Sequence, residues 1–279
     1  METKRDDWVR YFRAENQPIE AMHAYFRTHR YHPHSHDTYS FGVTERGVQA
    51  FRCRGAERAS VSGMVIAFNP DDPHDGHAGD APGFVYRIVH VGPAFVARIF
   101  GDALQGGSRQ GLPLFRDPVF SDARAEQALS RMFACLFDGG TELERDERLA
   151  DAILALSQRA GVTRELRTVR ESSAARVARA VRAELEDRFA SDIDLEALAQ
   201  SVGCSRYAMY RAFVARYGMA PSDYQRQCRL RAARRLLREG GSLAQAAVQS
   251  GFADQSHLTR WFARYFGITP GMYRRSGER

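Results

Sequence analysis

The C-terminal third of the chain contains an internal repeat whose residues are spaced as in a pair of crossing helices. Two series of the same residue types follow each other, and one interval, between the first glycine and the phenylalanine, differs by one residue. A small residue four positions before a glycine lets two helices cross closely, and the glycine permits a sharp turn between them. The repeat therefore predicts two helix–turn–helix modules. The two series are Ala199, Gly203, Phe213, Gly218, Pro221 and Tyr224, and then Ala247, Gly251, Phe262, Gly267, Pro270 and Tyr273.

Local signals predict that the chain is almost entirely helical from residue 174 to residue 273. Pro221 and Pro270 fit the first turn of a helix, where the missing N–H costs little. Ser205 and Asp254 stand where the second helix of each module needs an N-cap. The expected helices are Ala174–Phe189, Leu195–Ser201, Arg206–Tyr217, Pro221–Arg238, Leu243–Ser250, Gln255–Phe266 and Pro270–Arg274.

Charge is unevenly distributed along the chain. The net charge is +6 at pH 7, but residues 1–169 hold 21 basic and 23 acidic side chains, whereas residues 170–279 hold 19 and 11. The excess positive charge therefore coincides with the repeat, where a phosphate backbone would require it. The alternative is a set of packed helices with a solvated arginine face. Two modules in register with a balance of +8 favour DNA binding.

The second module and its flanks read GGSLAQAAVQSGFADQSHLTRWFARYFGITPGMYRR. This segment resembles the signature of the AraC/XylS family of bacterial transcription regulators, and the resemblance covers roughly the last 100 residues. In that family two modules joined by a long helix set recognition helices into successive major grooves. A double-stranded DNA operator and RNA polymerase are the implied partners. The residues that the resemblance assigns to DNA contact are Arg206, Tyr207, Tyr210 and Arg211 in the first module and Gln255, Ser256, His257, Thr259 and Arg260 in the second.

The chemistry of these residues agrees with that placement. Arginine pairs with guanine, glutamine with adenine, and threonine or tyrosine can touch a thymine methyl group or a phosphate. His257 has a second interpretation, in which it braces its own helix rather than reading a base. The arginines between Arg226 and Arg238 are expected to be solvated or to have partners within the chain.

The first part of the chain has the pattern of β-strands followed by a helical hairpin. Segments rich in Val, Phe and Ile, separated by turn residues, predict strands at 39–44, 48–53, 64–68 and 84–91 in a small barrel or sandwich. Residues 1–30 are expected to form an irregular arm with one strand, and Gly101–Pro118 a loop. Helical spacing then returns at Asp122–Phe137 and Leu143–Leu156. The apolar stripe of this hairpin predicts a homodimer interface, with packing on the β-domain as the alternative.

Eight of the nine histidines lie in the first 90 residues. His34 and His36 open the β region and His74 follows a proline turn, which resembles a cupin barrel in which an HxH pair meets a third histidine. Residues two apart share a strand face, so the three imidazoles can face the interior together. We predict that His34, His36 and His74 line a pocket for a small-molecule effector. The alternatives are a divalent metal such as Zn²⁺ or Fe²⁺, and ordinary structural histidines.

Two departures from the cupin pattern argue against the metal alternative. Ser40 and Phe41 stand where a glutamate is usual, with Glu45 further on, and Asp72 stands in place of a glycine. The segments HDTYSFGVTERGVQAFRCRG and NPDDPHDG also look like the sensor domain that precedes many AraC/XylS DNA-binding domains. In such sensors the barrel holds a small effector.

These features predict an α+β multidomain protein. A cupin-like β-barrel with a helical hairpin is expected at 1–160, a linker at 161–173, and an all-α double helix–turn–helix domain at 174–279. No apolar run approaches the length of a membrane span, and residues 1–10 lack the apolar core of a signal peptide, so a cytoplasmic protein is expected.

The predicted function is an effector-responsive transcription regulator, without enzymatic activity or a required cofactor. An effector that prefers one arrangement of the domains would shift the population competent to bind the operator. Two other classes are a metal-dependent cupin enzyme tethered to a DNA-binding domain and an architectural DNA protein without effector control. The sequence does not distinguish an activator from a repressor.

Overall fold

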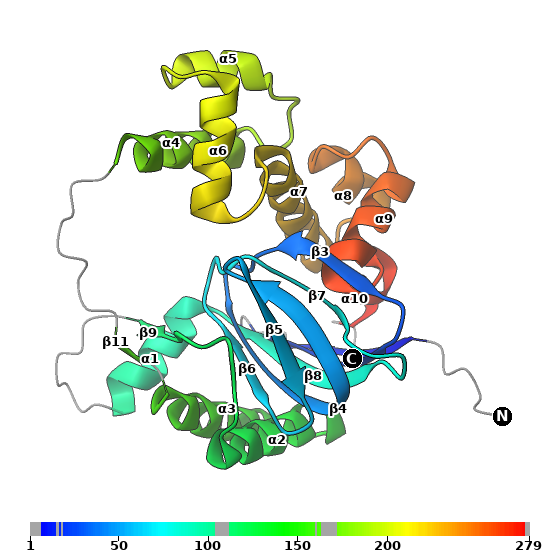
Figure 1. The fold of residues 1–279 in the computed structure, drawn as a ribbon. Coiled ribbons are helices and arrows are strands. Elements are labelled where there is room, and N and C mark those ends of the chain that lie inside the picture. The colour runs from blue at the N-terminus through cyan, green and yellow to red at the C-terminus, as the bar shows by residue number, and fades with distance from the viewer. Residues whose placement is uncertain are drawn as a thin grey trace. The chain divides into compact units, whose positions relative to one another are not determined.

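The structure, a computed structural model, describes residues 7–14, 17, 19–103, 112–159, 161–162 and 172–276. It divides into two compact units (Figure 1). The β-rich unit comprises residues 1–30 and 35–166, and the helical unit comprises Tyr31–His34 and residues 167–279. Most of the predicted linker, residues 163–171, lies outside the described residues.

An antiparallel sheet forms the framework of the β-rich unit. Its main path runs β1-β2-β8-β4-β6-β10, with β3, β5 and β7 attached beside it. This arrangement confirms the predicted β-sheet domain. The strands of this sheet are β1 (Trp8–Arg13), β2 (Ile19–Phe26), β3 (Arg30–His34), β4 (Tyr39–Cys53), β5 (Ala56–Val61), β6 (Val65–Phe68), β7 (His74–Ala78), β8 (Phe84–Val91) and β10 (Val119–Phe120). Two short strands, β9 (Pro113–Leu114) and β11 (Gly161–Val162), pair with each other in a separate sheet.

The long strand β4 belongs to both halves of this sheet. The sequence predicts two strands here with a turn at Arg46 and Gly47, but the structure has one continuous strand. A register shift between Thr44 and Arg46 bends it. Its first half pairs with β8 and β6, and its second half pairs with β5 and β7. Gly47, directly after this shift, has a φ of 75°, so a glycine inside an irregular strand gives the same sequence signal as a turn.

Two further segments differ from the sequence-based prediction. Residues 1–30 contain two paired strands, β1 and β2, rather than one. β2 is buried along almost its whole length and so lacks the alternation that marks a half-buried strand. The expected loop at Gly101–Pro118 overlaps the end of a helix, α1 (Pro93–Ala103), whose Phe95 and Val96 side chains enter the core. At the sheet edge, the Trp8 ring meets the His23 ring edge-on at 4.9 Å.

The predicted helical hairpin is present as α2 (Ala123–Asp138) and α3 (Glu142–Ser157). Asp122 caps α2, and Thr141 forms a capping box with Glu144 at the start of α3. The apolar stripe packs into one core with the sheet residues, and its members Leu149 and Ile153 are 2% and 1% exposed. The expectation that this stripe forms a dimer interface is therefore wrong, because its side chains are already buried within one chain.

The helical unit consists of seven helices within its described residues. The N- and C-terminal signals set the ends of four of them where the sequence predicts, and the other three differ by one or two residues. No helix among the described residues is long and apolar enough to cross a membrane. The helices are α4 (Ser173–Asp187), α5 (Leu195–Ser201), α6 (Arg206–Tyr217), α7 (Pro221–Arg238), α8 (Leu243–Gln249), α9 (Gln255–Phe266) and α10 (Pro270–Arg275).

Candidate functional site

The first helix–turn–helix module is formed by α5 and α6. Between them Gly203 adopts a φ of 70°, in the left-handed region that glycine enters without strain. Ser205 then caps α6 by accepting a hydrogen bond from the Ala208 backbone N–H at 3.2 Å. Ala199 and Phe213 are fully buried, so the two helices cross where the repeat predicts.

The second module, α8 and α9, repeats this arrangement, but its turn glycine packs closely against neighbouring backbone. Gly251 has a φ of 81°, and a Cβ atom at this position would also run into the backbone carbonyl of Ala190. Asp254 caps α9 by accepting a hydrogen bond from the His257 backbone N–H at 2.7 Å. A glycine with left-handed φ ends the second helix in both modules, Gly218 in α6 and Gly267 in α9.

Counting from these caps places the predicted DNA-contacting residues at equivalent positions of α6 and α9. Both helices have twelve residues, and the first, second, fifth and sixth positions hold the candidates. Residues at this spacing lie on one helix face. Three of the four positions are exposed in both helices. The equivalent pairs are Arg206 and Gln255, Tyr207 and Ser256, Tyr210 and Thr259, and Arg211 and Arg260.

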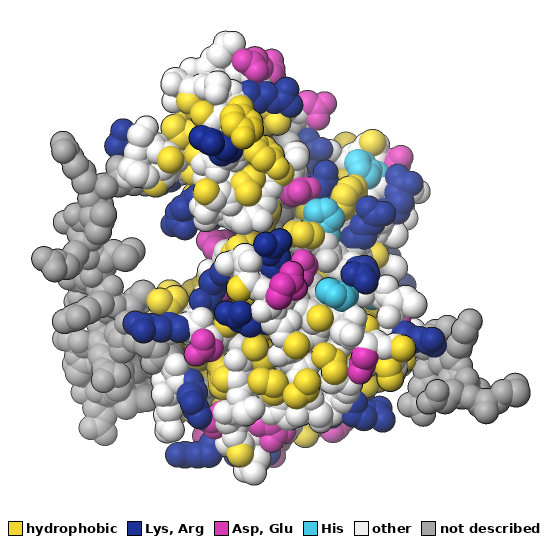
Figure 2. All heavy atoms as spheres, viewed as in Figure 1, with side chains coloured by type: hydrophobic (Ala, Val, Ile, Leu, Met, Phe, Trp, Pro, Cys, Tyr) yellow, Lys and Arg dark blue, Asp and Glu magenta, His cyan; other side chains and the backbone are white. Residues whose placement is uncertain are grey.

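Tyr207 and Tyr210 are large apolar groups left on the surface, 70% and 47% exposed. The Arg211 guanidinium lies 5.1 Å from the centre of the Tyr207 ring. Figure 2 shows hydrophobic side chains, a class that includes tyrosine, beside basic ones over α6. An exposed pairing of aromatic and cationic groups suits contact with bases and phosphates better than it suits solvent.

His257 stands at the third position of α9, where α6 has Ala208. Its Nε2 accepts a hydrogen bond from the Trp261 indole N–H at 3.0 Å, and its ring meets the Phe252 ring edge-on at 5.4 Å. The side chain thus braces its own helix, as the second interpretation of the sequence holds. The Thr259 hydroxyl also has a partner within α9, the Gln255 carbonyl at 2.8 Å.

Two arginines of α7, Arg226 and Arg229, have partners within the helical unit. Arg226 pairs with Asp223 and lies 3.8 Å from the centre of the Trp261 ring. Arg229 donates to the backbone carbonyls of Phe189 and Ser191. These contacts agree with the expectation that this arginine-rich face has partners within the chain.

The structure brings together His34, His36 and His74. Each can offer a ring nitrogen, and these nitrogens lie within 4.8 Å of one another. His34 and His74 are buried at 4% and 7% exposure, while His36 is half-buried. Burial lowers the pKa of His74 to about 4, so its imidazole is neutral at pH 7. His36 lies beyond the end of β3, so a shared strand face is not what joins it to His34.

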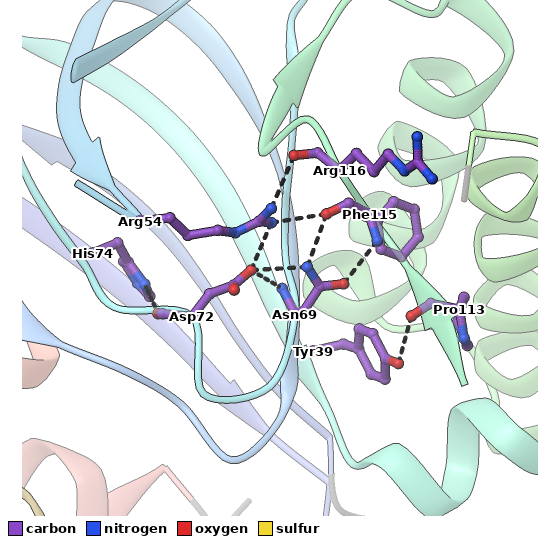
Figure 3. Close-up of polar contacts among 8 residues, drawn as sticks. All are labelled: Tyr39, Arg54, Asn69, Asp72, His74, Pro113, Phe115 and Arg116. Atoms are coloured by element: carbon purple, nitrogen blue, oxygen red, sulfur yellow. Dashed lines mark hydrogen bonds and ion pairs between the residues drawn. The ribbon is translucent and has the colours of Figure 1, made fainter. Parts of the chain in front are cut away.

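Asp72 organises the turn that presents His74 (Figure 3). Its Oδ2 accepts hydrogen bonds from the backbone and side-chain nitrogens of Asn69, at 2.8 and 2.9 Å, and from Arg54 at 2.8 Å. The Asn69 side chain also exchanges two hydrogen bonds with the backbone of Phe115. The residue that replaces the cupin glycine therefore fixes the loop, and its own carbonyl lies 2.8 Å from His74 Nδ1.

His90, which no sequence motif singles out, also lies at this cluster. Its ring centre is 4.4 Å from that of His36, and its Nδ1 is 2.9 Å from the Ser40 hydroxyl. Ser40 and His90 face each other in the pairing of β4 with β8. Only that long-range register connects His90 to the motif. Glu45 is the glutamate nearest to the position where cupins usually have one. It pairs instead with His23 and Arg87.

Comparisons with known proteins agree with both units. The AraC-like ligand binding domain family matches residues 16–157, and a helix-turn-helix domain family matches residues 198–276. The HTH-type transcriptional regulator YbfI of Bacillus subtilis is 28% identical over 225 residues, 81% of this chain and 80% of that protein. The HTH-type transcriptional activator RhaS of Escherichia coli (strain SE11) is 34% identical over 87 residues, 31% of each chain.

Solved structures show the same two-unit fold. ToxT of Vibrio cholerae with a bound unsaturated fatty acid matches with a TM-score of 0.53 at 12% identity, over 98% of this chain and 96% of that chain. An apo form of ToxT matches with a TM-score of 0.54 at 10% identity, over 99% of each chain.

A ligand-binding β-rich unit and a double helix–turn–helix unit together define a transcriptional regulator. The chain belongs to the AraC family, whose ligand-binding domain covers half of it. The relatives it matches are transcriptional regulators.

Proposed function

We propose that the chain controls transcription by reading two successive major grooves of an operator with α6 and α9. The observation that carries this proposal is that the exposed residues occupy equivalent positions in the two helices. Helix faces with the same arrangement are suited to the same kind of contact with DNA. Arg211 and Arg260 are the members best suited to read guanine, since a guanidinium can pair with both acceptors of that base. RNA polymerase is the proposed second macromolecular partner, and activation is the proposed output, as for the relative RhaS.

A small-molecule effector is proposed to bind at His34, His36 and His74. The family match to a ligand-binding domain supports this role, and ToxT, which shares the fold, binds an unsaturated fatty acid. An effector can act only through a difference in its affinity for the competent and incompetent states. The regulator is proposed to act in the cytoplasm as a homodimer and to catalyse no reaction. Its dimer surface is not the apolar stripe of α2 and α3.

Alanine at Arg211 or Arg260 should weaken operator binding by about 1–3 kcal/mol and relax the preference at one base position. Binding of each variant to a library of operator sequences measures both effects. Arg235→Ala is the matched control, because Arg235 is an exposed arginine of α7 outside both recognition helices. Unchanged sequence preference in both recognition-helix variants would contradict the assignment of α6 and α9.

A thermal-shift screen of small molecules against the full chain tests effector control. An effector should raise the melting temperature, since binding to the folded state stabilises it by mass action. The shift should disappear in His36→Ala and persist in His77→Ala. An architectural protein would show no shift with any compound, and turnover of a compound by the purified chain would identify an enzyme.

A further inference from the structure

The fifth residue of each recognition helix is held at the same angle to the core of its module. The fourth and eighth residues anchor each helix and are buried: Met209 and Phe213 in α6, and Leu258 and Phe262 in α9. Successive helix residues are about 100° apart around the axis, because a turn has about 3.6 residues. The fifth residue, Tyr210 in α6 and Thr259 in α9, therefore lies beside the buried stripe in the same way in both helices.

The hydroxyl group of Thr259 is already used inside α9. It donates its hydrogen to the Gln255 carbonyl at 2.8 Å, one turn earlier in the helix. A hydroxyl has a single hydrogen to donate, so this one is not offered to a phosphate or to a base acceptor while the bond lasts. What the half-buried side chain offers to a neighbouring molecule is therefore its methyl group, together with an oxygen that can only accept.

Tyr210 supplies a larger apolar group at the equivalent position of α6. It is 47% exposed, in a module whose other apolar anchors are buried. Water contact with an aromatic ring is unfavourable, so the ring gains free energy when an apolar group covers it. Both modules thus place an apolar group at the fifth position, although the two residue types differ.

The major groove of DNA offers one apolar group for such a contact. Every base pair displays hydrogen-bond donors and acceptors there, and only thymine adds a methyl group. An apolar side chain can therefore distinguish thymine from the other three bases by covering this methyl. The sixth position, Arg211 in α6 and Arg260 in α9, has a different chemistry, because a guanidinium pairs with the acceptors of guanine.

We propose that Thr259, through its methyl group, and Tyr210, through its ring, each read the 5-methyl group of one thymine in the operator. This inference rests on the proposed function of α6 and α9, and it names the base that the fifth position selects. The hydroxyl groups of the two residues are not required for this recognition. Since successive major grooves lie one helical turn apart, the two thymines are separated by roughly 10–10.5 base pairs.

Replacement of thymine by deoxyuridine tests the proposal, because it removes only the 5-methyl group. The probe is a duplex that the full chain selects from a randomised library, with its thymines replaced one at a time. Deoxyuridine at one position in each groove should weaken binding of the parent about fourfold, the effect of removing one methyl group from a buried contact. The two sensitive positions should lie one helical turn apart.

Matched pairs of variants identify the group that makes each contact. Thr259→Val keeps a methyl group and removes the hydroxyl, so it should bind the selected duplex like the parent and stay sensitive to deoxyuridine. Thr259→Ser keeps the hydroxyl and removes the methyl group, so it should bind about fourfold more weakly and lose sensitivity at its own thymine. Tyr210→Phe should likewise bind like the parent, whereas Tyr210→Ala should lose sensitivity at the other thymine only.

Weaker binding by Thr259→Val but not by Thr259→Ser would overturn the proposal, because the hydroxyl would then make the contact. Weaker binding by Tyr210→Phe to every sequence alike would also overturn it and indicate a phosphate contact instead. So would deoxyuridine sensitivity that persists in both Thr259→Ser and Tyr210→Ala. Sensitivity is the ratio of two affinities measured on one variant, so a partly unfolded preparation does not change it.

The parent alone separates this proposal from the function on which it rests. A parent that selects one sequence from the library but shows no deoxyuridine effect would reject the thymine assignment and leave the regulator function standing. A parent that selects no sequence would reject the reading of operator DNA by α6 and α9, and the thymine assignment with it.

Discussion

Aspartate in place of Ile153 should unfold the β-rich unit. Ile153 is 1% exposed and packs in the core shared by α2, α3 and the sheet. Substitution removes a large apolar side chain and buries a carboxylate with no partner, at a cost of about 5 kcal/mol or more. This approaches the whole stability of a typical domain. Urea denaturation followed by circular dichroism should show a lost or strongly shifted transition for the β-rich unit.

Leu143→Asp provides the matched control for this experiment. Leu143 belongs to the same helix, α3, but is 69% exposed, so the same change in charge should cost less than about 0.5 kcal/mol. A folded, monomeric Ile153→Asp protein derived from a dimeric parent would contradict the packing described here. It would instead show that the stripe serves an interface between copies of the chain.

Alanine in place of Gly251 should destabilise the helical unit much more than alanine in place of Gly203. Both glycines have left-handed φ angles, which cost an alanine about 1–2 kcal/mol. A Cβ at Gly203 would meet open space, whereas a Cβ at Gly251 would collide with the Ala190 carbonyl and force a shift costing about 1–3 kcal/mol more. We expect losses of about 1 kcal/mol for Gly203→Ala and about 3 kcal/mol for Gly251→Ala.

The free energy of unfolding of each variant, measured in urea, checks this difference. Operator binding should follow the same order, because displacement of the turn moves α9 relative to α8. Equal losses in the two variants would mean that the backbone near Ala190 yields without cost.

The helical unit was accessible from sequence because its signals are local. Ser205 and Asp254 cap the recognition helices, and Gly218 and Gly267 end them. The residues that determine each helix end therefore lie directly beside it in the sequence. The Trp261–His257 bond was also within reach, since the two residues are four apart on one helix.

The β-rich unit was harder to predict because its decisive contacts join distant segments. His90 reaches the histidine cluster through the register of β4 and β8, which no local pattern specifies. Asn69 and Phe115 are tied together across a long stretch of chain. The three histidines themselves were found because a short motif and a proline turn place them, and the structure brings these three together.

The two tryptophans of the chain are divided between the units, with Trp8 in β1 and Trp261 in α9. Each ring lies against an imidazole, that of His23 or that of His257. The two tryptophans therefore serve as intrinsic fluorescent probes, one in each unit. The tryptophan emission of a Trp8→Phe protein would come only from the second recognition helix, and that of a Trp261→Phe protein only from the edge of the sheet. The melting of each unit, and the arrival of DNA or a small molecule, can thus be followed separately without attaching a dye.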